Sequence, residues 1–318
     1  GIVSITKRAY TITKPTFWRM DMNETLTDNL ITSSGYERKQ HGTKDFPCAA
    51  YGSSLCQICY PWHWHEEFEL SVLTQGSLWF YTPRETILLG PGDGLFLNSE
   101  AMHYVEPYKN TDAAKLDLLF HGRLVYGQED SVFWKKYVQP LQQSSFQSFP
   151  LLGSVPWQRT LLEKAQKAHG LCVTRPAGYE FQVRSLLSEV ILELCLHLPG
   201  QDKDSRTVGR QEKERVKKML LYLHENYQRP ISLAELSAQV NICERECLRS
   251  FKKILRQSPI QYLIRYRILR ACLLLTEGSQ SILEVCESCG FESPSYFSKT
   301  FRSVMGCTPT QYLRGSRS

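Results

Sequence analysis

The chain has 318 residues, of which 42% are hydrophobic and 22% charged, and its formal net charge is +6. This length allows two domains, and the absence of a long apolar run excludes a membrane-spanning protein and a membrane partner. The eleven cysteines are odd in number and scattered, and no signal-peptide pattern is present. These features exclude a disulfide framework and predict reduced cysteines and a cytoplasmic location. Cys56 and Cys59 have a zinc-like spacing, whereas Cys286 and Cys289 fall on the core face of a predicted helix, where packing is the simpler interpretation.

Residues 1 to about 125 have the pattern of short strands separated by turns. Apolar and β-branched runs alternate with glycine and proline signals, of which the stretch 90–94 is the clearest. Many short strands with such turns predict a small all-β barrel or jelly roll. The clearest predicted strands are Ser71–Phe80, Thr86–Leu89, Gly94–Asn98 and Lys115–Phe120.

Histidines and a glutamate recur in this region with the spacing of a ligand-binding motif. His63, His65 and Glu69 would share one side of a strand, and His103 follows the glycine-rich turn. The set resembles the two histidine motifs of the cupin family, which implies that these side chains line the inside of the barrel. The resemblance further implies a pocket for a small-molecule effector, and nearby aromatic rings suit a sugar. The predicted effector-binding residues are His63, His65, Glu69, Trp79 and His103.

The same residues leave a metal site open as an interpretation. Three imidazoles and one carboxylate suit a divalent transition metal, as in the cupin enzymes. A metal site also needs groups that orient its ligands, and the spacing alone does not supply them. We therefore expect no metal and no other cofactor, and we keep His63, His65, Glu69 and His103 as the candidate ligands.

Two helices and a linker are predicted before residue 211. The helices are Trp157–Ala168 and Tyr179–Leu198, and the polar stretch 199–210 is predicted to be a linker. The expected domains are therefore 1–198, with the barrel at about 1–125 and helices at about 157–198, and 211–318. The second helix could pair with a second chain to form a homodimer, or cover its own sheet, through one apolar stripe. The stripe is Val183, Leu187, Val190, Leu194 and Leu198.

The last hundred residues contain the same sequence pattern twice. The segment Ser258–Leu263 recurs as Thr308–Leu313 at an offset of 50, and a Ser-x-x-Glu capping box begins at both Ser232 and Ser281. These repeats predict two helix-turn-helix units, whose natural partner is double-stranded DNA. Residues 211–318 hold 17 Lys and Arg against 10 Asp and Glu, and this basic balance suits a polyanion.

The region from about 216 to 313 resembles the DNA-binding domain of the AraC/XylS family of transcription regulators. The resemblance is carried by Leu248–Lys253, Ser258–Leu263 and Gly290–Phe301. It implies a sequence-specific regulator, most often an activator working with RNA polymerase, whose units insert their second helices into successive major grooves of a promoter. It assigns base contacts to Arg245, Leu248, Arg249, Ser295, Ser298 and Lys299. It assigns phosphate contacts to Lys252, Lys253, Tyr296, Thr300 and Arg302.

Three residues depart from the family pattern. Cys243 stands where a Ser-like helix cap is usual, Arg256 stands where the second copy has Gly306, and Cys286 replaces a common alanine. Loss of a good cap costs about 1 kcal/mol. The first unit is therefore expected to be the looser one.

The expected fold is two-domain, an all-β cupin or jelly-roll barrel with flanking helices and then an all-α double helix-turn-helix domain. The expected function is an effector-responsive DNA-binding regulator of transcription that is not an enzyme. Two alternatives remain open. One is a metal-dependent cupin enzyme fused to a DNA-binding domain, and the other is a constitutive DNA-binding protein whose cupin only dimerises.

Overall fold

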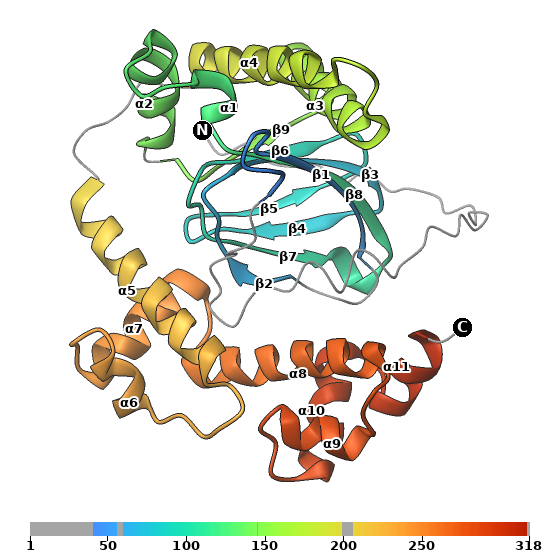
Figure 1. Cartoon of the computed structure of the whole chain (residues 1–318). Helices are drawn as coiled ribbons and strands as arrows, with labels where there is room; N and C mark the ends of the chain where they lie inside the picture. The colour runs from blue at the N-terminus through green and yellow to red at the C-terminus, as the bar shows by residue number, and fades with distance from the viewer. Residues whose placement is uncertain (1–40, 56–59, 145, 199–205, 317–318) are drawn as a thin grey trace.

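A computed structural model describes residues 41–55, 60–144, 146–198 and 206–316 of the chain. They form a β-rich domain, up to residue 198, and a helical domain, from residue 206 onward (Figure 1). This confirms the predicted fold class. No helix within these ranges is long and apolar enough to cross a membrane. The Cys56 and Cys59 pair, and the part of the predicted barrel before residue 41, lie outside the described residues.

Two antiparallel sheets make up the β-rich domain. The five-stranded sheet has the order β1-β8-β3-β6-β9, and the four-stranded sheet has the order β2-β7-β4-β5. The predicted strand at 71–80 is divided between β3 and β4 at Gly76, whose φ is +67° and where a Cβ atom would lie 2.2 Å from the carbonyl oxygen of Asp112. The strands are β1 Cys48–Leu55, β2 Tyr60–His63, β3 Phe68–Gln75, β4 Leu78–Tyr81, β5 Thr86–Leu89, β6 Gly94–Leu97, β7 His103–Pro107, β8 Ala113–Phe120 and β9 Ser148–Leu151.

Helices cover the outer face of the five-stranded sheet (Figure 1). Phe68 and Leu70 of β3 point into this layer, where they share a core with the buried side chains Val183, Leu187 and Val190. The predicted apolar stripe therefore covers its own sheet. The helical segments of this domain are η1 Tyr108–Asn110, α1 Arg123–Tyr126, η2 Trp134–Val138, α2 Gln139–Gln142, α3 Pro156–Thr174 and α4 Tyr179–His197.

The helical domain repeats its plan as the sequence predicts. The 12-residue helices α7 and α10 begin 50 residues apart, and so do α8 and α11. We call α6 and α7 the first unit and α9 and α10 the second unit. The helices are α5 Arg206–Glu225, α6 Leu233–Ala238, α7 Glu244–Leu255, α8 Pro259–Glu277, α9 Ile282–Ser288, α10 Pro294–Met305 and α11 Pro309–Ser316.

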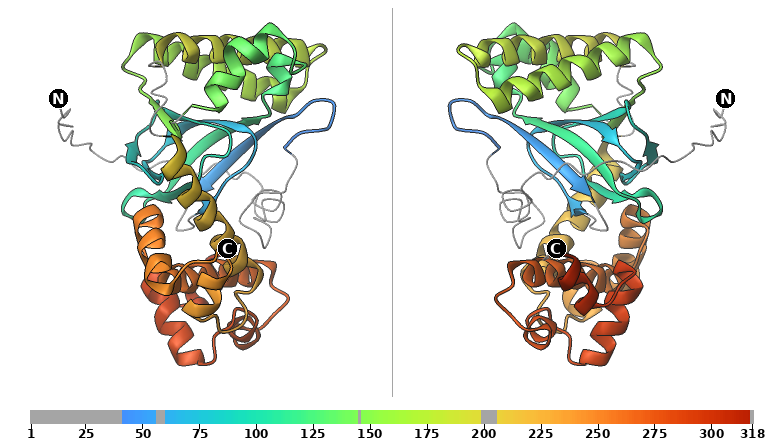
Figure 2. Two further views of the ribbon diagram at one scale, coloured as in Figure 1. Left: turned by 90° about the vertical axis from the view of Figure 1, so that its left-hand side faces the viewer. Right: turned by 90° about the vertical axis from the view of Figure 1, so that its right-hand side faces the viewer.

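Helix α5 corrects the predicted linker. It begins at Arg206, so the last five residues of the predicted stretch 199–210 are helical, while 199–205 lie outside the described residues. From there the helical domain lies against the side of the β-rich domain that carries the four-stranded sheet, opposite α3 and α4, as both views of Figure 2 show.

The ends of the two equivalent helices α7 and α10 differ as the sequence predicts. Ser293 accepts a hydrogen bond from the amide of Tyr296 at the start of α10, whereas Cys243 makes no side-chain cap at the start of α7. Both helices stop at a left-handed residue, which is Gly306 for α10 and Arg256, at φ +60°, for α7.

Candidate functional site: a buried histidine pocket and two exposed helices

The space between the two sheets has an apolar half and a polar half. Strand alternation sends Leu73, Phe80 and Val105 into the apolar half, where they form a closed core. The polar half belongs to the neighbouring ends of the same strands, and its side chains are all less than 9% exposed. They are His63, His65, Glu69, Ser71, His103, Lys115 and Asp117.

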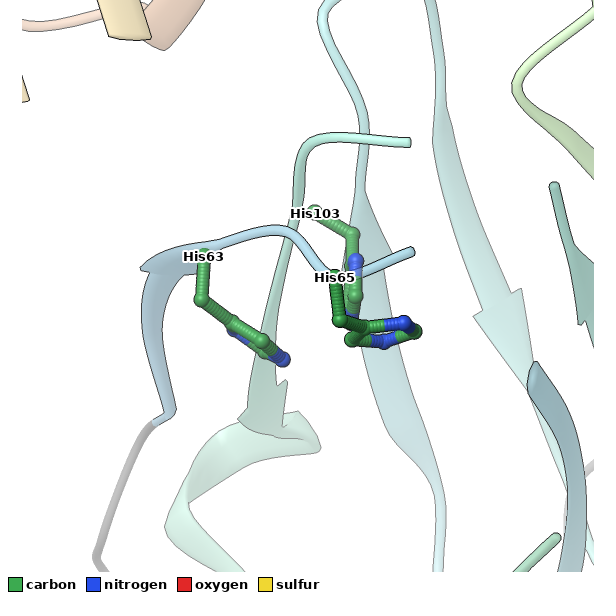
Figure 3. A group of neighbouring side chains, drawn as sticks. All are labelled: His63, His65 and His103. Atoms are coloured by element: carbon green, nitrogen blue, oxygen red, sulfur yellow. The ribbon is translucent and has the colours of Figure 1, made fainter. Parts of the chain in front are cut away.

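Three histidines converge in the polar half (Figure 3). His63 lies at the end of β2, opposite His103 at the start of β7, and His65 lies two residues after His63. One nitrogen from each ring lies within 4.8 Å of the others. The structure thus brings together the three histidines that the sequence predicts.

Glu69 lies against two of these histidines, and one of its oxygens faces a nitrogen of each ring. The Nδ1 atoms of His65 and His103 lie 3.0 and 2.9 Å from backbone carbonyl oxygens, which can only accept, so these nitrogens carry the ring protons. Their Nε2 atoms lie 3.2 and 3.3 Å from the same carboxylate oxygen of Glu69. In neutral rings these Nε2 atoms are acceptors facing an acceptor. A proton or a bound cation between these atoms would make the contacts favourable.

The rest of the pocket is a buried ion network. Burial would raise the pKa of Glu69, but the charge of Lys115 and hydrogen bonds with His103 and His65 hold it well below its usual value. Burial and the nearby Glu69 instead raise the pKa of Asp117, despite its ion pair with Lys115. When both acids are ionised, two carboxylates face one ammonium, which makes the pocket anionic before the histidines are counted.

The donor set fits a divalent transition metal. Ligand atoms about 2.1 Å from a tetrahedral ion stand roughly 3.4 Å from one another, close to the 3.2 and 3.3 Å that separate Glu69 Oε2 from the two Nε2 atoms. Backbone carbonyls on Nδ1 are the partners that fix a ligating imidazole. The residues present would also hydrogen-bond a polar molecule.

Trp79 does not belong to this pocket. It pairs with Glu106 across β4 and β7, so it lies on the opposite face of the sheet from His103. There its ring contacts those of Tyr81 and Tyr108. Proximity in sequence suggested Trp79, but the register of β4, which decides its face, was not visible in the pattern.

Sequence reasoning missed three polar members of the network. Ser71 lies 2.7 Å from Glu69 and 2.6 Å from Asp117, and Lys115 pairs with both acids. A signal was present, since Lys115 and Asp117 alternate with apolar residues in β8 and so share one face.

The predicted DNA contacts lie on the outer faces of α7 and α10. Cys247, Phe251 and Phe297 bury the inner faces of these helices. Lys253 pairs with Glu212 of α5, and Arg249 lies 3.7 Å from Glu246. Except for the half-buried Thr300, the predicted residues are exposed: Arg245, Leu248, Arg249, Lys252, Lys253, Ser295, Tyr296, Ser298, Lys299 and Arg302.

The helical domain also buries the second cysteine pair. Cys286 and Cys289 are 1% and 0% exposed, inside the core of the second unit. Burial raises the pKa of Cys289 to about 12, which keeps its thiol protonated. Both cysteines act as packing residues there.

Two family models match the chain. One, described as an AraC-like ligand binding domain, matches residues 51–171, and one, described as a helix-turn-helix domain, matches residues 236–315. The two ranges together cover more than half of the chain, and they fall on the β-rich domain and on the two units.

Two relatives align with this chain across both of its domains. The regulator YdeC of Bacillus subtilis, an uncharacterized helix-turn-helix protein, is 29% identical over 90% of this chain and 98% of its own length. The transcriptional activator RhaS of Klebsiella pneumoniae is 23% identical over 82% of this chain and 90% of its own. Among solved structures, ToxT of Vibrio cholerae aligns with a TM-score of 0.43 and 14% identity, over 87% of this chain and 99% of that chain. The chain belongs to the AraC family of helix-turn-helix transcriptional regulators, with a ligand-binding domain ahead of its DNA-binding domain.

Proposed function

We propose that this regulator reads two adjacent segments of promoter DNA, one with α7 and one with α10. The observation that carries the proposal is the repeat, because it presents two equivalent helices with exposed polar faces on either side of α8. Helix α8 has 19 residues and is therefore about 28 Å long, which is comparable with the roughly 34 Å turn of duplex DNA.

The proposed base contacts differ between the units. Arginine reads guanine through two hydrogen bonds, whereas serine reads bases weakly. The first unit should therefore supply more of the specificity. The proposed base contacts are Arg245, Leu248, Arg249, Ser295, Ser298 and Lys299, and the proposed phosphate contacts are Lys252, Lys253, Tyr296, Thr300 and Arg302.

The polar half of the barrel is the proposed effector site. Its two carboxylates disfavour an acidic ligand and offer acceptors to a molecule rich in hydroxyl groups, so a neutral sugar is the proposed class. His63, His65, Glu69 and His103 would contact it. A divalent metal is the second candidate occupant, favoured by the two Nε2 atoms that face Glu69.

The remaining parts of the proposal concern the working complex. The relatives are named as regulators, which supports a chain without catalytic activity, and the name of RhaS supports activation. An activator must reach promoter DNA and RNA polymerase, so the proposed location is the cytoplasm. A homodimer is proposed, and it must use a surface other than the buried stripe of α4.

A ligand screen tests the proposed site. A ligand that binds the folded chain raises its melting temperature by mass action. Purified protein would be screened with neutral sugars, Zn²⁺ and Mn²⁺, and its metal content measured by elemental analysis. A sugar shift without stoichiometric metal supports the effector proposal, and stoichiometric metal without a sugar shift supports the second candidate. The absence of both would contradict this assignment of the pocket.

Matched variants test whether the ligand that raises the melting temperature binds beside Glu69. Glu69→Gln keeps the shape of the side chain but removes its charge, and should abolish the shift. Glu66→Gln, three residues earlier on an exposed side chain, should leave it unchanged. An equal shift in both variants would place the ligand elsewhere.

A further inference from the structure

The strand segments that carry the histidines have a second buried face. Along β2 and β7, His63 and His103 point inward, and Trp62 and Tyr104 alternate with them and point outward. Trp64 and Met102 follow the same pattern. All four outward side chains are at most 7% exposed. An outer sheet face this well buried must be covered by another part of the molecule.

The helical domain provides the cover. The four outward side chains belong to one hydrophobic core with residues of α5, α6, α7 and the first half of α8. In Figure 1 these helices lie below β2 and β7. The two domains therefore share a core on the side of the first unit.

Two ion pairs fix this contact. Lys217 of α5 is 7% exposed, and its Nζ lies 2.7 Å from a carboxylate oxygen of Glu100 and 5.1 Å from the centre of the Trp64 ring. Arg265 of α8 lies 2.7 Å from Glu106 of β7. A buried ammonium is costly unless it is paired, so the docked arrangement depends on Glu100 remaining beside Lys217. We call these two ion pairs the domain latch.

The second ion pair is built into an aromatic cluster. Tyr81 donates to Glu106 at 2.5 Å, Tyr104 donates to the same carboxylate, and Arg265 donates to the Tyr104 hydroxyl. The guanidinium also lies 5.1 Å from the centre of the Tyr104 ring. Tyr104 directly follows His103, so a shift of His103 would also displace a residue that accepts a hydrogen bond from Arg265.

The second unit is packed differently. Its core contains α9, α10, α11 and the second half of α8, and among the described residues it includes no side chain of the β-rich domain. Contact with the β-rich domain is thus concentrated on one of two otherwise similar units.

We propose that the outer face of β2 and β7 is a docking surface for the first unit, and that changes at the histidine pocket on the inner face act on that unit through the domain latch. The second unit follows only through α8. Ligand binding would then adjust one half of the DNA-reading surface and leave the other half as a fixed anchor. A ligand can shift this docking only by its different affinities for the docked and undocked states.

Hydrogen exchange on the full chain tests the latch. The main variant changes only the β-rich domain, as Glu100→Gln with Glu106→Gln, so the helix sequences stay intact. We expect amide exchange in α5 and the first half of α8 to rise by roughly tenfold, because docked amides exchange through local opening. Exchange in α10 should remain as in the unmodified protein. Glu129→Gln with Asp130→Asn, on an exposed loop, is the charge-matched control.

A second pair of variants tests the path from the pocket. His103→Ala, on β7, should also raise exchange in α5 and α8. Ser53→Ala, on β1 of the other sheet, removes a buried polar group that contacts Asp117 and should not. Circular dichroism would confirm that each variant is folded. Lys217→Ala repeats the latch test from the helical side, and Lys218→Ala, at its exposed neighbour, is the control.

Each outcome decides a step. Unchanged exchange in α5 and α8 of the folded double variant, or an equal rise in α10, overturns the docking proposal. A response to the latch variants but not to His103→Ala overturns the path from the pocket. That path rests on the proposed effector site, whereas the latch result does not, so the two failures are distinguishable.

Discussion

The two helix-turn-helix units share one plan but are stabilised in different ways. The second unit uses local signals, with a serine cap at Ser293 and a glycine stop at Gly306. In the first unit, helix α7 follows the uncapped Cys243 and stops at a left-handed Arg256, and the unit shares its core with the β-rich domain. Weak local signals therefore coincide with strong contacts to the other domain. A unit held by tertiary contacts can respond to its neighbour, and one held by local signals remains fixed.

The largest expected effect comes from removing an equivalent phenylalanine from each core. Phe251 and Phe301 are both fully buried, and substitution by alanine should cost about 3–5 kcal/mol of folding free energy. Only Phe251→Ala should also raise hydrogen exchange in β2 and β7, because its core includes Trp62 and Tyr104. Urea denaturation with exchange measurements checks both. Equal exchange in β2 and β7 for the two variants would break the comparison.

A lower pH should destabilise the core that the first unit shares with the β-rich domain more than it destabilises the core of the second unit. Burial lowers the pKa of His224, in the core beside Tyr262, from 6.5 to about 3. Between these values the unfolded chain binds a proton that the folded chain does not, so stability falls as the pH falls below about 6.5. The expected loss between pH 7.5 and 5 is about 2 kcal/mol.

Denaturation of the His224→Gln variant at both pH values measures how much of this loss of stability comes from His224. The variant should have a flatter pH dependence than the unmodified chain. An unchanged slope would assign the acid sensitivity to other groups, such as the ion network around Glu69.

Substitution of Arg256 should have a smaller effect on the stability of the first unit. A left-handed conformation costs a residue other than glycine about 1 kcal/mol, and Arg256 has φ +60°. Arg256→Gly should therefore stabilise the first unit by up to about 1 kcal/mol. The thermal midpoint of the variant checks this, and a lower midpoint would indicate that the arginine side chain supports the fold.

The smallest expected effect is at the start of α7. Cys243→Ser should add the missing cap and stabilise the first unit by about 0.5–1 kcal/mol, and Ser293→Ala should destabilise the second by a similar amount. Denaturation of the two variants side by side measures the difference. No gain from Cys243→Ser would show that docking already compensates for the missing cap.

Much of this organisation could be predicted because it depends on short-range signals. Capping boxes and the offset of 50 place the helices. Two-residue alternation predicts His63, His65 and Glu69 on one strand, but the structure places His63 at the end of β2, Glu69 in β3 and His65 between the two strands. Other features depend on register or on distant partners. Trp79, predicted to bind the effector, lies on the outer face of its sheet. Strand β9 is short and contains Pro150, and the domain latch joins residues more than 100 positions apart. A single sequence carries no local signal for such contacts.

The most direct test of the account is selection of duplex DNA from a random library by the full chain. Base preferences would be measured for the unmodified protein, Arg249→Ala and Ser298→Ala. The account predicts two preferred segments about 10 base pairs apart. Arg249→Ala should lose about 1–3 kcal/mol of specific binding and relax a position in one segment, and Ser298→Ala should weakly relax the other. A single preferred segment, or relaxation of the same base pairs by both variants, would contradict it.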